Sequence, residues 1–242
     1  MIDVIAAITL TVLAAGSLAA LILTAPLERP TRWRLALGAG AWFVVVGALA
    51  AAGLFVSPLG TPAIGLFVLG PVVLAAASGR RGSVTRRLAL GIPLAVLVVV
   101  NAGRLLGAFF LLLQADGRLS PTFASTAGWG DITAAALALP VAWLVHRRGP
   151  GWRPVTLAWN AFGFVDLLVA VTLGVGSQPA FPLRFIFEEP GTGLMASLPW
   201  LLIPGYLVPL YLLTHLAVFA QLAARPGRQA WPNQTSPAAR QT

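Results

Sequence analysis

Residues 98–113 read VVVNAGRLLGAFFLLL, an apolar run of the kind that crosses a membrane, with Arg104 near its middle. Two later apolar runs carry a charge in the same way. Asp131 follows AGWG in a run that ends ALALPVAWLV, and Asp166 lies in WNAFGFVDLLVAV at 159–171. An ionised side chain in hydrocarbon costs about 3 kcal/mol or more, so such residues usually face the interior of a helix bundle and pair there. These three charges are therefore the first candidates for a functional site.

The composition is that of a membrane protein. Of the 242 residues, 58% are hydrophobic and 10% are charged, and the mean hydropathy is +0.86. A soluble domain carries about 25% charged residues, so this surface must largely face something other than water. The formal charge of +9 comes from arginines between the apolar runs, and we therefore expect a lipid bilayer and no nucleic acid as partner. The absence of lysine and cysteine excludes a retinal Schiff base, disulfides and thiol chemistry.

The expected fold class is all-α, a bundle of seven transmembrane helices. A helix needs about 20 mostly apolar residues to cross a hydrocarbon core about 30 Å thick. The third run is the weakest of the seven, because Gly65, Gly70 and Pro71 interrupt it. The polar, proline-containing residues 223–242 predict a disordered cytoplasmic tail after a membrane domain at 1–222. The predicted spans are 4–26, 35–56, 62–78, 88–113, 122–146, 154–176 and 193–222.

The arginines predict an orientation for these spans. Basic residues gather on the cytoplasmic side of membrane proteins, and here one side holds thirteen arginines whereas the other holds Arg118 and Arg184. This places the N-terminus outside and the C-terminus in the cytoplasm of a multi-pass protein of the bacterial inner membrane, where an all-arginine basic complement fits a GC-rich genome. The first run has no early basic residue and is too long for a signal peptide, so we expect it to be retained. The thirteen are Arg29, Arg32, Arg34, Arg80, Arg81, Arg86, Arg87, Arg147, Arg148, Arg153, Arg225, Arg228 and Arg240.

The three buried charges are predicted to share one depth. Each lies nine or ten residues from the outer end of its span, which is about 13–15 Å at a rise of 1.5 Å per residue. Further polar residues lie at 101, 160, 211 and 215. Those at 101 and 160 are on the same spans as Arg104 and Asp166, and those at 211 and 215 share one face of the last span, so we include all four in the predicted site. The predicted binding or proton site comprises Arg104, Asp131, Asp166, Asn101, Asn160, Tyr211 and His215.

The last outer loop, FPLRFIFEEPGTG at 181–193, mixes aromatic residues with Arg184, Glu188 and Glu189. It is either a short amphipathic cap over the outer mouth of the bundle or a surface loop with local pairing of arginine and glutamate.

The C-terminal half resembles a known group. Residues 181–222, with the interrupted runs around NAGRLL, AGWGD and WNAFG, are similar to a widespread group of bacterial multi-pass membrane proteins of unknown function. The most specific parts are the EP of the outer loop, the ladder LP-x-x-LIP-x-x-LVP and the TH-L that follows it. The resemblance covers roughly 88–222 and implies architecture and location. Relatives carry Glu or His near the end of the fourth span, where this chain has the apolar residues 110–113.

Two functional hypotheses remain open. The first is a small-solute or proton-coupled transporter that uses Arg104, Asp131 and Asp166, with Pro204 and Pro209 as a flexible break. The second is a non-transporting sensor or assembly partner in which the three charges form a structural clamp. The sequence has no P-loop, HExxH, GxSxG or metal-ligand spacing. We therefore expect no cofactor and no metal, and an enzyme acting on lipid is the least favoured alternative.

Overall fold

The computed structural model describes residues 1–56, 60–79, 83–179 and 181–224. The predicted disordered tail falls almost wholly on residues 225–242, which lie outside the described residues, as do Arg80, Arg81, Arg225, Arg228 and Arg240. All regular secondary structure in the described ranges is helical. The elements are α1 (Ile2–Thr24), α2 (Arg29–Ala51), η1 (Leu54–Val56), α3 (Gly60–Ser78), α4 (Val84–Gly91), α5 (Leu94–Val100), η2 (Asn101–Leu106), α6 (Gly107–Ala115), α7 (Pro121–Arg147), α8 (Trp152–Gly176), η3 (Gly193–Ala196), η4 (Ile203–Leu207) and α9 (Val208–Ala223).

Six helical stretches in the described residues are long and apolar enough to cross a membrane. A shorter apolar helix, Pro62–Ser78, lies within α3. The six are Ile2–Thr24, Arg29–Ala51, Leu94–Ala115, Pro121–Arg147, Trp152–Gly176 and Ile203–Ala223. The chain is thus an all-α protein with the composition and helix lengths of a multi-pass membrane protein.

Prolines explain where the helices depart from the predicted spans. α2 begins at Arg29, six residues before the predicted start, because Pro30 occupies the first turn, where its missing N–H costs nothing. The span predicted at 88–113 is divided at Pro93, which holds Ile92 in an extended conformation between α4 and α5. The span predicted at 193–222 becomes a continuous membrane-length helix only from Ile203, since residues 197–201 around Pro199 form a bend and turns.

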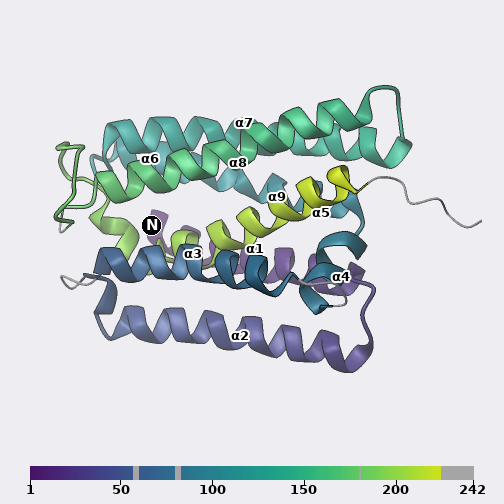
Figure 1. Ribbon diagram of the computed structural model, residues 1–242. Coiled ribbons are helices and arrows are strands. Elements are labelled where there is room, and N and C mark those ends of the chain that lie inside the picture. The colour runs from purple at the N-terminus through teal and green to yellow at the C-terminus, as the bar shows by residue number, and fades with distance from the viewer. Residues whose placement is uncertain (57–59, 80–82, 180, 225–242) are drawn as a thin grey trace, which may run out of the picture.

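The helices run side by side along one axis, with successive long helices reversing direction (Figure 1). α7 packs against α8, α6 and α5, and α9 packs against α3, α4, α5 and α8. α9 therefore connects α3 and α4 with α5 and α8. α2 lies at the edge and buries only Val46. The N-terminal end of α1 and the C-terminal end of α9 lie at opposite ends of the bundle (Figure 1).

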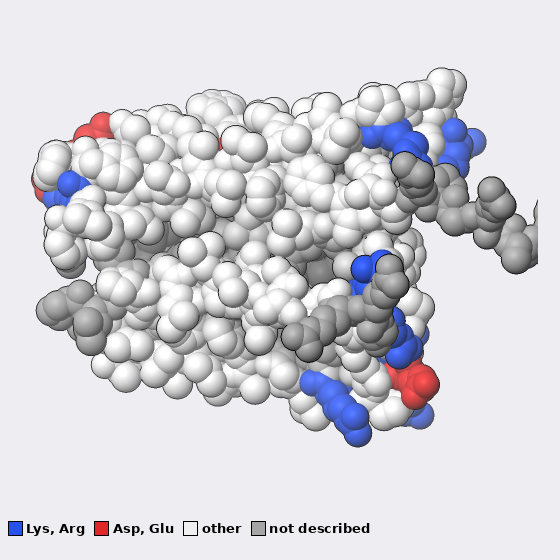
Figure 2. Space-filling model, in the orientation of Figure 1, with Lys and Arg blue, Asp and Glu red and all other residues white. Residues whose placement is uncertain are grey.

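The surface separates charge from apolar area. On the face shown in Figure 2, most basic side chains gather at one end of the bundle, beside a small acidic group. The other end carries acidic side chains and a smaller basic group, and the area between is almost free of charge. Many large apolar side chains are exposed along the helices, among them Leu37, Leu66 and Leu74, each 68–70% exposed. Contiguous exposed apolar area of this extent marks a surface that contacts lipid or another apolar partner.

Candidate functional site

Arg104 lies on a short 3-10 segment inside a membrane-length helix. The segment η2 interrupts the α-helical pattern between α5 and α6, and in a 3-10 helix side chains three residues apart eclipse each other. Asn101 and Arg104 therefore project to the same side, and both are fully buried. A 3-10 stretch in the middle of a helix often marks a functional or strained position, and here it is the position of the buried cation.

The guanidinium of Arg104 joins four elements. Its Nε donates to Oδ1 of Asp131 on α7 at 2.7 Å, and its Nη2 donates to Oδ2 of Asp166 on α8. Its Nη1 donates to the carbonyl of Gly163 on α8 at 2.9 Å and lies 3.3 Å from Nε2 of His215 on α9. The structure thus brings the three predicted charges into one cluster, called the charge cluster below (Arg104, Asp131 and Asp166).

Glycines allow the helix backbones to approach closely enough for these contacts. A Cβ at Gly107 would lie 2.6 Å from Cβ of Asp131 and 2.7 Å from the Gly128 carbonyl. A Cβ at Gly163 would lie 2.7 Å from the ring of His215 and 3.0 Å from Nη1 of Arg104. Small residues at such crossings permit close packing of membrane helices. The Gly163 position has a further role, because its carbonyl accepts a hydrogen bond from the guanidinium.

His215 and Asn160 bind each other on the far side of Arg104. Nδ1 of His215 lies 2.8 Å from Oδ1 of Asn160, and Nδ2 of Asn160 donates to the backbone carbonyl of His215 at 3.1 Å. Arg104 can only donate, so Nε2 of His215 must accept and Nδ1 must carry the proton that Asn160 accepts. The network therefore requires a neutral His215, and with both carboxylates ionised the charge cluster carries a net charge of −1.

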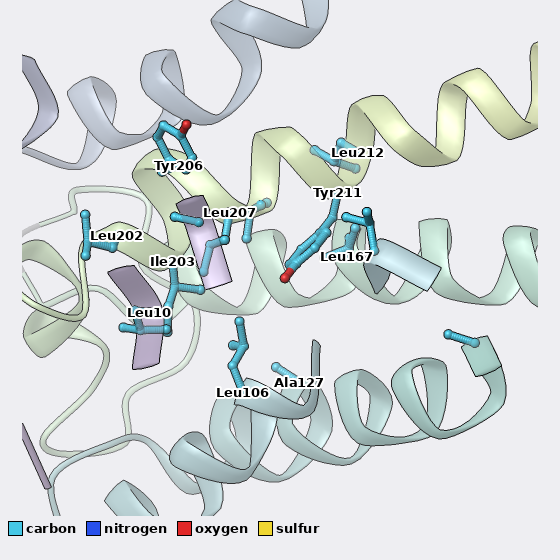
Figure 3. Close-up of a cluster of buried hydrophobic side chains, with 14 of the residues drawn as sticks. Leu10, Leu106, Ala127, Leu167, Leu202, Ile203, Tyr206, Leu207, Tyr211 and Leu212 are labelled. Carbon is cyan, nitrogen blue, oxygen red and sulfur yellow. The ribbon is translucent and has the colours of Figure 1, made fainter. Parts of the chain in front are cut away.

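Asn101 and Tyr211 lie beside the charge cluster rather than on it. Asn101 donates to the Leu97 carbonyl and to Thr214 Oγ1, and Thr214 in turn donates to the Tyr211 carbonyl. The Tyr211 side chain reaches from α9 toward the level of Leu106 and Ala127 (Figure 3). Its hydroxyl packs so closely on Gly103 that a Cβ there would lie 2.5 Å from it.

A pocket between α3 and α8 reaches Asp131. Its walls come mainly from apolar side chains of α3, α6, α7, α8 and the η4–α9 segment, and its cavity volume is about 80 Å³. The polar residues that line it are Asp131 at depth and Gln178 and Thr192 after the end of α8. Among the described residues, hydrogen bonds to the Asp131 carboxylate come from Arg104 alone and reach only Oδ1. One member of the charge cluster is therefore open to a cavity.

The neighbouring η4 segment is a π-helix. It spans Ile203–Leu207, and Ile203 and Pro204 line the pocket. A π-helical turn leaves carbonyls without their usual partner, and Trp42 Nε1 of α2 donates to the Gly205 carbonyl at 3.1 Å. Such turns occur frequently at functional sites. The break predicted at Pro204 therefore corresponds to an irregular helical turn in the pocket wall.

The outer loop is a surface loop with local pairing. Arg184 forms an ion pair with Glu189 at 3.1 Å and donates to the Ile186 and Glu188 carbonyls. Glu188 accepts from the Ser120 hydroxyl at 2.7 Å and from the backbone N–H of Thr122 at 2.9 Å, which fastens the loop to the start of α7. Hydrogen bonds from Thr122 and Ser120 hold the pKa of Glu188 below its usual value. Residues 181–192, of which all are described, contain no helix, so the amphipathic cap is not formed.

Three contributors to the site carry no sequence signal of their own. The Gly163 carbonyl is a backbone group, and Thr214 is one hydroxyl in an apolar helix. Gln178 follows the end of α8 in a turn, and its Oε1 is buried without a hydrogen-bond partner among the described residues. Polarity next to a span end is ordinary, so Gln178 could be recognised only once the pocket was known.

Apolar helices of membrane length around a buried arginine–carboxylate cluster define this chain as a multi-pass α-helical membrane protein. It belongs to the family of the domain of unknown function DUF8737, whose model matches residues 61–223. The match runs from α3 to α9 and includes every residue of the predicted site. Neither the comparison with curated proteins nor that with solved structures gives a match.

Proposed function

We propose that this chain is a seven-span protein of the bacterial cytoplasmic membrane that moves protons, alone or together with a small solute, by way of the charge cluster. The observation that carries the proposal is that Asp131 both pairs with Arg104 and lines a cavity. A carboxylate that is fixed by a buried cation on one side and accessible on the other is the arrangement typical of an intramembrane proton or ligand site.

The seventh span is α3. Its apolar part, Pro62–Ser78, is 17 residues long, about 26 Å at 1.5 Å per residue, which approaches the hydrocarbon thickness of about 30 Å. With α3 counted, the described arginines Arg29, Arg32, Arg34, Arg86, Arg87, Arg147, Arg148 and Arg153 fall on one side, which the positive-inside rule makes cytoplasmic. The N-terminus is then outside, and Gln178 and Thr192, which line the pocket after the end of α8, lie toward the outer side of the membrane.

The charges support a role in proton transfer. Arg104 is fully buried and has a permanent charge, so it cannot release a proton itself. Asp131 uses one oxygen for Arg104, and its second oxygen is free to take a proton or a donor group from the cavity. The η4 turn in the pocket wall is the element whose rearrangement would alternate access to this oxygen.

A second function, the structural clamp of a sensor or assembly partner, is favoured by a different observation. Arg104 is completely enclosed and binds groups on α7, α8 and α9 at once. Such a bridge fixes the relative positions of four elements whether or not anything passes through them.

Proton flux into proteoliposomes separates the two functions. Purified protein is reconstituted into liposomes that contain a pH-sensitive dye, and a potassium diffusion potential drives proton entry. We expect entry above that of empty liposomes with the wild type and a loss of at least tenfold with folded Asp131→Asn and Asp166→Asn. Arg118→Gln, which alters an ion pair at the outer end, serves as the control with flux unchanged. Wild-type flux equal to that of empty liposomes contradicts the proposal, and loss of the folded protein in the Asn variants supports the clamp.

A further inference from the structure

We infer that the pocket between α3 and α8 binds an organic monocation, a primary alkylammonium with a short apolar chain, whose ammonium group meets the Asp131 carboxylate. The inference rests on the proposed function, because it names the substrate class of the same site.

The charge of the ligand follows from the charge cluster. Two carboxylates face one guanidinium, and His215 accepts from Arg104 as a neutral imidazole, so when both carboxylates are ionised one negative charge has no buried counterpart among the described residues. An uncompensated charge in a membrane protein interior is costly. A bound monocation at the open oxygen of Asp131 removes that cost, whereas an anion would add to it.

The lining selects an organic cation over a metal ion. The pocket wall near Asp131 consists of apolar side chains such as Val68, Leu167 and Val208. A strongly hydrated metal ion needs several oxygen ligands, and the described His, Asp and Glu side chains form no group of three that could hold one. Phe110 and Phe123, whose ring centroids lie 5.2 Å apart, line the same pocket, and aromatic rings attract ammonium groups.

Gln178 is a second polar residue in the lining of the pocket. Gln178 is 6% exposed, its Oε1 is buried without a hydrogen-bond partner among the described residues, and it lines the pocket. Leu167, Val171 and Val175 on α8 line the pocket between Asp131 and Gln178, so the ligand's apolar chain lies along this face of α8.

The size and position of the pocket limit the ligand. A cavity of about 80 Å³ has room for several water-sized groups, which corresponds to a short chain rather than a whole lipid. α3 packs on α9 and η4, whereas α8 packs on α7 and α9, and the pocket lies between the two. The molecule is hollowed on this face between the part with α8 and the part with α3 (Figure 2). An amphiphilic cation can therefore enter from the outer half of the membrane.

Equilibrium dialysis with n-hexylammonium tests the inference. The full chain is placed in nanodiscs and dialysed against radiolabelled n-hexylammonium, with empty nanodiscs subtracted, and hexan-1-ol and hexanoate are used as competitors. We expect saturable binding at one site that neither competitor displaces. Asp131→Asn and Gly65→Leu should each weaken it at least tenfold. Gly65 lines the pocket and has open space around its Cβ, so the leucine fills the cavity without touching the charge cluster.

Gly70→Leu is the matched control, since it makes the same change on α3 away from the pocket, and it should bind like the wild type. Absence of saturable binding, displacement by hexan-1-ol at equal concentration, or unchanged binding in Gly65→Leu overturns the inference. Dialysis uses no gradient, so the two proposals can fail separately. Binding without proton flux supports the binding site and refutes proton transport, whereas proton flux without binding refutes only the ligand class.

Discussion

Replacing Arg104 with methionine tests the energetics of the charge cluster most directly. Methionine keeps the apolar stem and removes the charge, so Asp131 and Asp166 stay buried without their partner. With charge centres about 4 Å apart and an effective dielectric constant of about 20, each pair attracts by about 4 kcal/mol. The several kcal/mol needed to desolvate the arginine offset part of these two attractions. The expected net loss is about 3–5 kcal/mol, a large share of a typical unfolding free energy of about 5–15 kcal/mol.

The assay is equilibrium unfolding in mixed micelles, followed by the fluorescence of the eight tryptophans. Arg118→Met is the matched control. It also breaks an arginine–aspartate pair, at 2.9 Å from Asp3, but both side chains are 33–46% exposed, so it should cost less than about 1 kcal/mol. The triple variant Arg104→Met/Asp131→Asn/Asp166→Asn removes the uncompensated charges and should recover most of the loss. If the triple variant is as unstable as Arg104→Met alone, the loss comes from packing and the electrostatic reasoning is refuted.

Two further predictions concern the outer loop and the helix crossing. The pKa of Glu188 is held below its ordinary value of 4.5, so its bonds to α7 stabilise the protein above that pH and are lost as the pH falls through the lowered pKa. The thermal unfolding midpoint of Glu188→Gln should therefore lie below that of the wild type at pH 6 and converge with it in acid. Glu189→Gln, at a more exposed position, should show no such convergence. Gly163→Ala should destabilise the protein by about 1–3 kcal/mol, because its Cβ meets His215 and Arg104. Gly47→Ala, with no atom within 4 Å of its Cβ, should be neutral or slightly stabilising in the same unfolding assay.

Much of the helical fold could be predicted from the chain because the signals are local. Runs of apolar residues predict membrane helices, and the helices at α1, α7 and α8 lie within two residues of their predicted bounds at each end. The early start of α2 at Pro30 and the division of the span at Pro93 are also local effects. The arginines next to Pro30 hid the first, and the uninterrupted hydropathy around Pro93 hid the second. The order and direction of the helices follow from the gaps between the runs.

The meeting of Arg104 with Asp131 and Asp166 was predictable in outline, since equal depth on three consecutive spans leaves few alternatives. Helical spacing also linked Tyr211 with His215 and Asn101 with Arg104. It did not predict that Asn101 donates to Thr214, which donates to the Tyr211 carbonyl, or that these residues lie beside the charge cluster. Helical spacing shows which residues share a face of one helix, but not which other helix packs against that face.

The sequence by itself determined the class of this protein, the approximate positions of most of its helices and the three charges that cannot face lipid, because hydropathy and the cost of charge in hydrocarbon act residue by residue. Only the tertiary structure decided which atoms meet. Arg104 binds the Gly163 carbonyl and lies against His215, groups 59 and 111 residues away along the chain. The structure also placed Asp131, whose Oδ2 accepts no hydrogen bond from the described residues, in the lining of a cavity that Gln178 lines as well. Those contacts depend on how closely helices pack at glycines. Close packing depends on the surfaces of both helices in a pair, so it cannot be deduced from the sequence of one helix alone.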